Sequence, residues 1–369
     1  MSRSSRRLIV VAFALAVFAA IAWGLIHVPA VQDAVFRHVI DRNLATTRTD
    51  LLAPDALRVV LCGTGDPLPD RDRADACTAI FAGGNIYLVD VGPGAWRNLA
   101  LWRIPAPRLA AVMLTHFHSD HIGDLGEVNM QTRAQGRAHP LRVYGPPGVE
   151  QVVNGFMQAY ALDERYRVAH HGAALMPPAN WQMEPLTVKI DTPPGASPCA
   201  GGSAPVVEEN GLKVTAFTVD HSPAAPAYGY RFDYKGRSVV ISGDTVKCAN
   251  LVAAAAGADV LIHEAQAAHL VKLIEDAAER GGNARVARIM HDILLYHTTP
   301  VEAASVANQA GVEMLVLSHI GPPTPNALAR IAFMRGVATV RPHAVVLGYD
   351  GMLLTLPEGT KTIDISPIQ

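Results

Sequence analysis

The sequence is poor in charge and has no long basic run, which limits the partners that it can attract electrostatically. Only 17% of its 369 residues are charged, and the formal net charge is −2. Proteins that bind nucleic acid usually present a basic face, because contacts to phosphate groups dominate their affinity. The composition therefore predicts that nucleic acid is an unlikely partner, although it does not exclude a basic patch that only folding assembles.

One long apolar run is present, at the N-terminus. Arginines at positions 3, 6 and 7 precede it, and it extends from Leu8 to Ile26. A positive start followed by an apolar segment is typical of export across a bacterial inner membrane. The run is close to the roughly 20 residues that span a bilayer. We therefore expect residues 1–30 to be an uncleaved membrane anchor, with the rest of the chain facing the periplasm, or a signal peptide whose removal leaves a periplasmic protein.

Cysteine is scarce, and its spacing disfavours a structural zinc cluster. The four cysteines form no Cys-x-x-Cys pair. An even number of cysteines in an exported protein suggests disulfide bonds. Three pairings are possible; we favour Cys62 with Cys77, across the ends of two neighbouring strands, and Cys199 with Cys248. Free buried cysteines are the alternative.

The remainder of the chain has the pattern of one large globular domain. Residues 31–55 have apolar positions at helical spacing and are expected to form a juxtamembrane helix and linker. Residues 56–358, with strands first and then alternating helices and strands, are predicted to form a mixed α/β domain. The Pro- and Gly-rich stretch 163–210 is predicted to be an irregular, substrate-facing insertion. Residues 359–369 would form a C-terminal tail, and the charged stretch Asp66–Asp75 a solvated loop.

The most informative stretch joins a buried strand to a cluster of metal-binding residue types. Ala110–Leu114 is uninterrupted apolar sequence, which predicts a strand. Residues two apart on an extended chain point to the same side, so side chains that alternate after the strand can converge. Imidazole and carboxylate groups bind zinc. Within six positions the chain supplies four such groups, which suits two adjacent metal ions: His116, His118, Asp120 and His121.

The pattern His-x-His-x-Asp-His after a hydrophobic strand resembles the metallo-β-lactamase superfamily. That resemblance implies an α/β fold with four layers, an αβ/βα sandwich of two mixed β-sheets flanked by helices, here preceded by an N-terminal hydrophobic segment. Further stretches resemble the ribonuclease Z branch, which includes arylsulfatase-like members. They are Cys62–Gly65, Ser242–Thr245, Ala258–Ala265 and His297–Thr299.

Three more candidate ligands follow predicted strands at points where apolar residues give way to turn residues: His221, Asp244 and His319. The resemblance implies two zinc ions, one held by three histidines, the other by an aspartate and two histidines, with a second aspartate bridging both. In that order, the ligands are His116, His118 and His221; Asp120, His121 and His319; and Asp244. Manganese or iron would fit the same mixed donors.

Candidate catalytic residues also come from the resemblance. Asp120 would steer the proton of a metal-bridging hydroxide, and His297 would act at the leaving group. His263 and Glu264 would orient His297. The alternative for His297 is a surface residue at the start of a helix.

The chain departs from ribonuclease Z in two places. It has neither the long flexible arm that grips tRNA nor the Pro-x-Lys-x-Arg-Asn loop. With the export signal and the near-neutral charge, these absences favour an exported dizinc hydrolase that attacks a small-molecule phosphoester or sulfate ester. The alternatives are a lactonase or β-lactamase-type hydrolase, a ribonuclease Z-like endoribonuclease, and a non-catalytic binding module. The resemblance makes a homodimer plausible.

Overall fold

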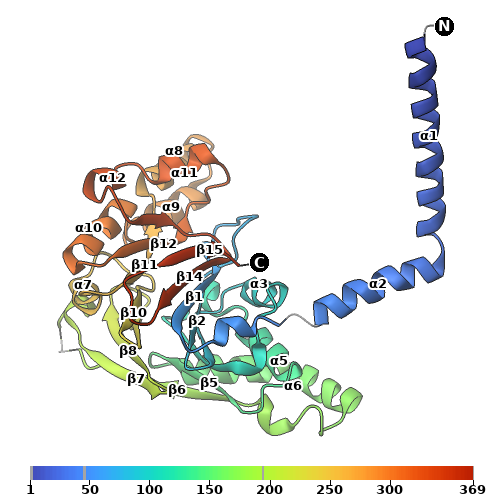
Figure 1. Cartoon of the computed structure of the whole chain (residues 1–369). Coiled ribbons are helices and arrows are strands. Elements are labelled where there is room, and N and C mark those ends of the chain that lie inside the picture. The colour runs from blue at the N-terminus through green and yellow to red at the C-terminus, as the bar shows by residue number, and fades with distance from the viewer. Residues whose placement is uncertain (1–2, 45–46, 193–194, 369) are drawn as a thin grey trace. The chain divides into compact units, whose positions relative to one another are not determined.

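The computed structural model describes residues 3–44, 47–192 and 195–368 (Figure 1). The few positions of the predicted anchor, linker, insertion and tail at 1–2, 45–46, 193–194 and 369 lie outside the described residues. The chain divides into two units, Met1–Thr47 and Arg48–Gln369. The first unit contains two helices, α1 (Arg3–Ile26) and α2 (Pro29–Leu44). Within α1, Ser4–Ile26 is long and apolar enough to cross a membrane.

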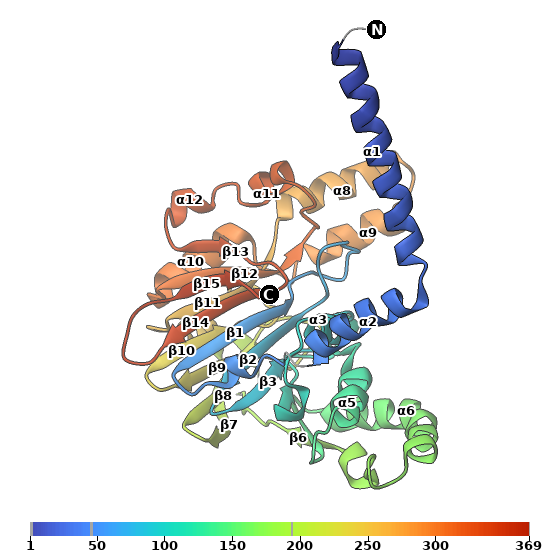
Figure 2. The same cartoon turned by 45° about the vertical axis from the view of Figure 1, so that its right-hand side comes forward.

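The second unit is built on two mixed β-sheets (Figures 1 and 2). The first sheet has eight strands in the order β15 (Asp364–Pro367), β14 (Met352–Pro357), β1 (Ala56–Gly63), β2 (Cys77–Ala82), β3 (Asn85–Val89), β4 (Leu109–Met113), β5 (Leu141–Gly145) and β6 (Met183–Thr187). The second has seven in the order β13 (Val345–Leu347), β12 (Met314–Gly321), β11 (Val260–Gln266), β10 (Arg237–Ile241), β9 (Ala227–Tyr234), β8 (Leu212–Val219) and β7 (Ser203–Glu209). In each sheet, antiparallel pairing gives way to parallel pairing.

Helices cover the outer face of each sheet. The first sheet carries α3 (Ala95–Leu101), α4 (Ser119–Ile122), α5 (Leu125–Ala134) and α6 (Val149–His171). The other helices follow in the second half of the chain: α7 (Ala249–Ala254), α8 (Ala268–Arg280), α9 (Ala284–Ile293), α10 (Pro300–Ala310), α11 (Ala327–Phe333) and α12 (Val337–Val340). Short 3-10 turns are η1 (Thr49–Leu52), η2 (Ala106–Arg108), η3 (Pro178–Trp181) and η4 (Pro198–Ala200).

The alternation of side chains along the strands explains the layers. In β1, Leu57, Val59 and Leu61 belong to the core between the two sheets, whereas Val60 and Cys62 belong to the core beneath the helices of the first sheet. Because β1 is covered on both faces, its central residues Val59–Cys62 are apolar without interruption. A third core lies between the second sheet and its helices. The predicted four-layer αβ/βα sandwich is confirmed.

Two predicted irregular segments contain strands. The stretch 163–210 includes β6 and β7, and the predicted tail includes β15. β6 and β7 are edge strands and contain Pro185 and Pro205. An edge strand tolerates proline because its N–H groups on the open side have no neighbouring strand to pair with. The prolines led the sequence analysis to predict irregular structure here. Whether the segment faces substrate stays a prediction.

Both predicted disulfides are present. The Cα atoms of Cys62 and Cys77 are 4.9 Å apart, and those of Cys199 and Cys248 are 5.0 Å apart. The first bond joins β1 to β2, and the second joins η4 to the residue that precedes α7. No free cysteine is present in the described ranges.

Candidate metal centre

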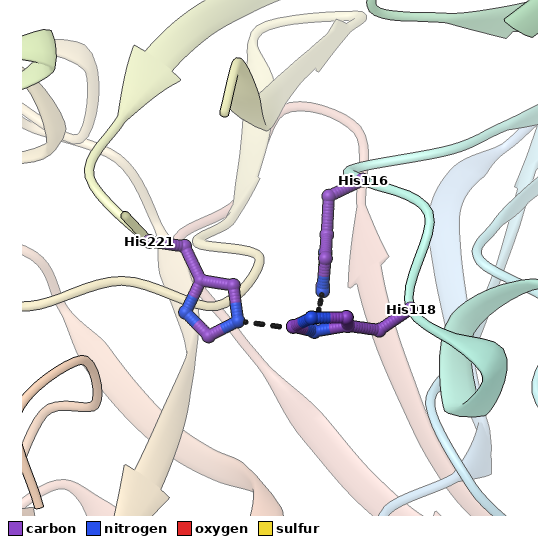
Figure 3. Close-up of side chains that lie close together, drawn as sticks. All are labelled: His116, His118 and His221. Carbon is purple, nitrogen blue, oxygen red and sulfur yellow. Dashed lines mark hydrogen bonds between the residues drawn. The ribbon is translucent and has the colours of Figure 1, made fainter. Parts of the chain in front are cut away.

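A first group of histidines meets where β4 and β8 end. His116 and His118 follow β4, and His221 follows β8. Nε2 of His116 lies 3.0 Å from Nδ1 of His118, and Nε2 of His221 lies 3.3 Å from the same atom. Figure 3 shows the three rings pointing toward one another. His116 and His221 are buried, and His118 is exposed, which makes His118 the side of the group that solvent can reach.

A second group lies beside the first and combines two carboxylates with two imidazoles. Nε2 of His319, in β12, is 3.2 Å from Oδ2 of Asp120 and 3.4 Å from Oδ2 of Asp244. Nε2 of His121 is 3.3 Å from both of these oxygens. All four residues are buried. Ligand atoms within each group lie within 4.8 Å of one another.

Asp244 joins the two groups. Its Oδ2 lies 3.8 Å from Nε2 of His221 and 4.0 Å from Nε2 of His116, in addition to its contacts in the second group. The residue lies in the turn Ser242–Thr245, which directly follows β10. Gly243 in this turn has a φ of 61°, and a Cβ there would lie 2.5 Å from the main-chain oxygen of Tyr228, so only glycine fits. The turn therefore places the Asp244 carboxylate between both sets of histidines.

The residues fit a pair of metal ions. Two buried carboxylates and several buried imidazoles converge. Nε2 of His121 lies 3.3 Å from Oδ2 of Asp120 and Asp244, yet its geometry gives no hydrogen bond among the described residues. Burial lowers the pKa of His116 well below its ordinary value, which keeps that imidazole in the neutral form that binds metal. Burial alone would raise the pKa of Asp244, but the charges of His319 and His121 hold that pKa well below its ordinary value. This mixed nitrogen and oxygen donor set is typical of zinc and is compatible with manganese or iron.

Neighbouring groups fix the ring orientation of the buried histidines. Nδ1 of His121 donates to Oδ2 of Asp90 at 2.8 Å, and Nδ1 of His221 donates to the main-chain oxygen of Tyr296 at 3.0 Å. The hydroxyl of Thr115 donates to Asp90 and accepts from Nδ1 of His116 at 3.1 Å. Each contact leaves Nε2 facing the centre.

Asp90 and Thr115 were missed from the sequence. Asp90 directly follows β3, where apolar residues give way to turn residues. The same signal identified His221, Asp244 and His319. Applied to every strand end, it would also have found Asp90.

His297 lies against the centre and is held by Glu264. Nδ1 of His297 donates to Oε1 of Glu264 at 3.1 Å, and its ring stacks on that of His319 with centroids 5.7 Å apart. The main-chain N–H groups of Thr245 and Thr298 donate to the same carboxylate oxygen. Burial lowers the pKa of His297, but the charge and hydrogen bond of Glu264 outweigh it and the net shift is upward.

The structure does not bring His263 to the centre. Its Nδ1 contacts the main-chain oxygen of Glu264 at 2.7 Å, and the ring is fully buried. Because neighbouring residues of a strand face opposite sides, Glu264 reaches His297 while His263 points the other way. Both residues were predicted from the sequence to orient His297, but of the two only Glu264 contacts it.

The loop after β1 is less solvated than expected. Asp66 is only 6% exposed, and burial raises its pKa to about 7. Asp350, from the turn before β14, accepts from the N–H groups of Thr64 and Ala74 and so ties the loop down. The expectation of a solvated loop is therefore wrong for Asp66, because the partner that buries this loop comes from the far end of the chain.

Comparisons with known proteins agree with this architecture. The family described as "Beta-lactamase superfamily domain" matches residues 85–320. The ribonuclease Z of Mycolicibacterium paratuberculosis is 37% identical over 269 residues, which cover 72% of this chain and 86% of that protein. The ribonuclease Z of Mycobacterium sp. (strain KMS) is 37% identical over 297 residues, 80% of this chain and 94% of that protein.

Solved structures show the same fold. The short form of human tRNase Z gives a TM-score of 0.58 at 21% identity and covers 81% of this chain and 99% of its own. The metallo-β-lactamase fold protein YhfI from Bacillus subtilis gives a TM-score of 0.57 at 20% identity, with 82% and 100% covered.

The fold and the two ligand groups define a metal-dependent hydrolase. The chain belongs to the metallo-β-lactamase superfamily, in the branch that contains ribonuclease Z. This finding corrects the prediction that nucleic acid is an unlikely partner, because the relatives at 37% identity are named as ribonucleases. Net charge sums the whole surface and says little about the field at one site.

Proposed function

We propose that this protein is a ribonuclease Z-like phosphodiesterase that cleaves RNA with two metal ions. The observation that carries the proposal is the position of Asp244, whose Oδ2 lies within 4.0 Å of imidazole nitrogens from both ligand groups. One group consists of His116, His118 and His221, and the other of Asp120, His121 and His319. A carboxylate in this position can bridge two ions, which a single-metal site does not require.

A pair of divalent ions in such a site supplies Lewis acidity for a phosphoryl oxygen and an activated water as nucleophile. The protein supplies the ligands and their orientation. Asp90, Tyr296 and Thr115 hold the rings of His121, His221 and His116, so each presents Nε2. His118 offers Nδ1 at the exposed side, where substrate enters.

His297 is the candidate general acid. Glu264 favours its protonated form and fixes Nδ1, which leaves Nε2 as the atom that donates to the leaving oxygen of the ester. Glu264 is itself fixed by two main-chain N–H groups. Asp120, which accepts from His319, is the carboxylate placed to orient the proton of the attacking water.

The segment between His221 and Asp244 is short, which favours a substrate that is bound close to the bond that is cleaved. β9 and β10 are joined by Lys235 and Gly236 alone, so this part of the chain has no long arm. We infer that RNA is bound by residues around the mouth of the metal centre rather than by a remote arm.

The reaction is tested with the full-length protein, loaded with zinc or manganese in detergent. The substrates are an RNA with a 3′ extension, bis(p-nitrophenyl) phosphate, p-nitrophenyl sulfate and nitrocefin. We expect cleavage of the RNA and the phosphodiester, and loss of both after chelation. Turnover of the sulfate ester or of nitrocefin without phosphodiester turnover would overturn the proposal and favour the arylsulfatase-like or β-lactamase-type alternative.

We also propose that α1 anchors the enzyme in a membrane, with residues 48–369 on the oxidising side. The apolar segment Ser4–Ile26 and the two disulfides support this orientation. Fractionation with protease protection tests it: the protein should sediment with membranes, and protease added from the outer side should digest the catalytic unit. A soluble protein whose four cysteines react with a thiol reagent in fresh extract would contradict it.

A further inference from the structure

A cavity of about 390 Å³ lies one strand beyond the candidate metal ligand His319. Strands β12 and β13 are parallel neighbours, with Leu317 opposite Leu347. Their carboxyl ends therefore meet at one edge of the sheet. His319 lies near the end of β12, which ends at Gly321, and Gly348 directly follows β13. Ligands of parallel sheets bind outside this edge. The cavity and the candidate metal centre therefore lie at the same edge of the second sheet.

The guanidinium of Arg73 lines the cavity and is fixed by hydrogen bonds to neighbouring residues. Arg73 donates through Nη1 to the main-chain oxygen of Gly348 at 2.7 Å and to the hydroxyl of Thr64. Asp350 in turn accepts hydrogen bonds from the Thr64 hydroxyl and from the N–H of Ala74. A guanidinium fixed in this way is preorganised, because little side-chain freedom remains to be lost when an anion binds.

The cavity is also lined by two polar side chains for which no partner is found among the described residues. Arg330, at the exposed face of α11, forms no ion pair in the described part of the chain. Thr324 is only 4% exposed, and its hydroxyl has no hydrogen-bond partner among the described residues. A buried hydroxyl without a partner costs free energy, which a ligand oxygen in the cavity would offset. Two guanidiniums and a hydroxyl form a donor set that is typical of phosphate recognition.

Two carboxylates, Asp70 and Asp72, also line the cavity and would oppose an anionic ligand unless they are neutralised or point away. Asp70 accepts from the N–H of Asp72 at 2.9 Å and lies 3.9 Å from Nε of Arg73. The Asp72 side chain is exposed at the rim. The charges of Asp350 and Asp70 thus partly offset that of Arg73. Arg330 forms no ion pair among the described residues and is the guanidinium left to attract an anionic ligand.

We propose that this cavity is a second phosphate subsite, which binds a phosphate group next to the one that is cleaved. The inference rests on the proposed phosphodiesterase function and narrows its substrate class to compounds with at least two phosphates. The second phosphate could be an internal one of an RNA strand or a terminal one of a short oligonucleotide. Both share the chemistry that Arg73, Arg330 and Thr324 recognise.

Binding is measured by calorimetry on the full-length, chelator-treated protein, so that bound metal does not capture phosphate. The probes are UpU, its terminally phosphorylated forms pUpU and UpUp, and UpUpU, which has a second internal phosphate. We expect at least one of the three larger probes to bind about tenfold or more tightly than UpU. Tight binding by UpUpU alone would identify an internal RNA phosphate, and tight binding by pUpU or UpUp a terminal one.

The variants are Arg330→Gln and Thr324→Val, with Arg335→Gln as the matched control. Arg335 is exposed on the same segment but does not line the cavity. The preference for the second phosphate should vanish in Arg330→Gln, shrink in Thr324→Val and persist in the control. With metal restored, KM for the preferred probe should rise in Arg330→Gln, while hydrolysis of bis(p-nitrophenyl) phosphate stays unchanged.

Equal affinities for all probes, or a preference that survives Arg330→Gln, would overturn the subsite. This failure differs from a failure of the proposed function. If the wild type prefers a second phosphate but its metal-loaded form hydrolyses no phosphodiester, the subsite stands and the phosphodiesterase proposal fails.

Discussion

Oε1 of Glu264 lies 3.1 Å from Nδ1 of His297, and the same oxygen accepts from the N–H groups of Thr245 and Thr298. One carboxylate oxygen therefore connects three segments: strand β11, the turn that contains Asp244, and the loop that contains His297. Because the contact sets both the position and the charge of His297, it is the basis of the first prediction.

Glu264→Gln should lower the rate of phosphodiester hydrolysis by about 10–100-fold, the range usual for partners of site residues. Burial lowers the pKa of His297 and Glu264 raises it, so removal of the charge lowers that pKa. A general acid is lost as pH rises through its pKa, so the alkaline limb of the pH–rate profile should move to lower pH. Exposed Glu313→Gln is the control. An unmoved limb in Glu264→Gln would show that His297 does not act as the acid.

Asp90→Ala should weaken metal binding by about 10–100-fold, because Nδ1 of His121 loses its acceptor. The variant also leaves the N–H of Thr115 without the oxygen that it reaches at 2.8 Å. Asp90→Asn keeps an oxygen in place and should fall between Asp90→Ala and wild type. Competition with a fluorescent zinc chelator measures the affinities. Wild-type affinity in Asp90→Ala would show that His121 needs no such support.

Metal affinity should increase with pH. Burial lowers the pKa of His319, but the charge of Asp244 and the hydrogen bond to Asp120 raise it to about 10. The pKa of His121 is also raised, by Asp244 and Asp90 against the effect of burial. Both imidazoles must lose their protons before they bind metal, so uptake releases protons. Calorimetry in buffers of different ionisation enthalpy counts them, and His319→Ala should release fewer. Uptake without proton release would contradict the predicted ligand set.

Removal of the bond between Cys62 and Cys77, by serine at both positions, should lower the free energy of unfolding by about 3 kcal/mol, as expected for a loop of this length. The loop that it closes contains Asp66 and Arg73, so binding at the proposed phosphate subsite should weaken as well. Denaturant titration measures the change in stability. Serine at Cys199 and Cys248 is the control for the binding measurement, since that disulfide closes a loop elsewhere in the chain and its removal should leave binding at the subsite unchanged. Equal stability with and without the first bond would contradict the prediction.

Much of the centre could be predicted from the sequence because its ligands sit at strand ends. His116, His118, Asp120 and His121 are close in the chain, so local geometry alone brings them together. His221, Asp244 and His319 each follow or end an apolar run, and parallel strands bring such ends to one edge. The structure places all seven side chains together, and their role as metal ligands stays a prediction.

The rest depends on contacts between residues far apart in sequence. Asp350 buries the loop around Thr64 across 286 positions, and no local pattern reports such a contact. The strands β6 and β7 were not predicted because each contains a proline, which only edge strands tolerate. The position of His263, by contrast, could have been predicted. Consecutive residues of a strand face opposite sides, so His263 and Glu264 cannot both face His297.

The most direct test of the central claim measures metal content and activity together in the wild type and in Asp244→Ala. Elemental analysis of the full-length protein should find two metal ions per wild-type chain, with hydrolysis of bis(p-nitrophenyl) phosphate and of RNA. Asp244→Ala should hold fewer ions and lose more than about 100-fold in rate, because a bridging ligand matters more than the partners behind it. One ion per wild-type chain, or full activity in Asp244→Ala, would contradict a two-metal phosphodiesterase.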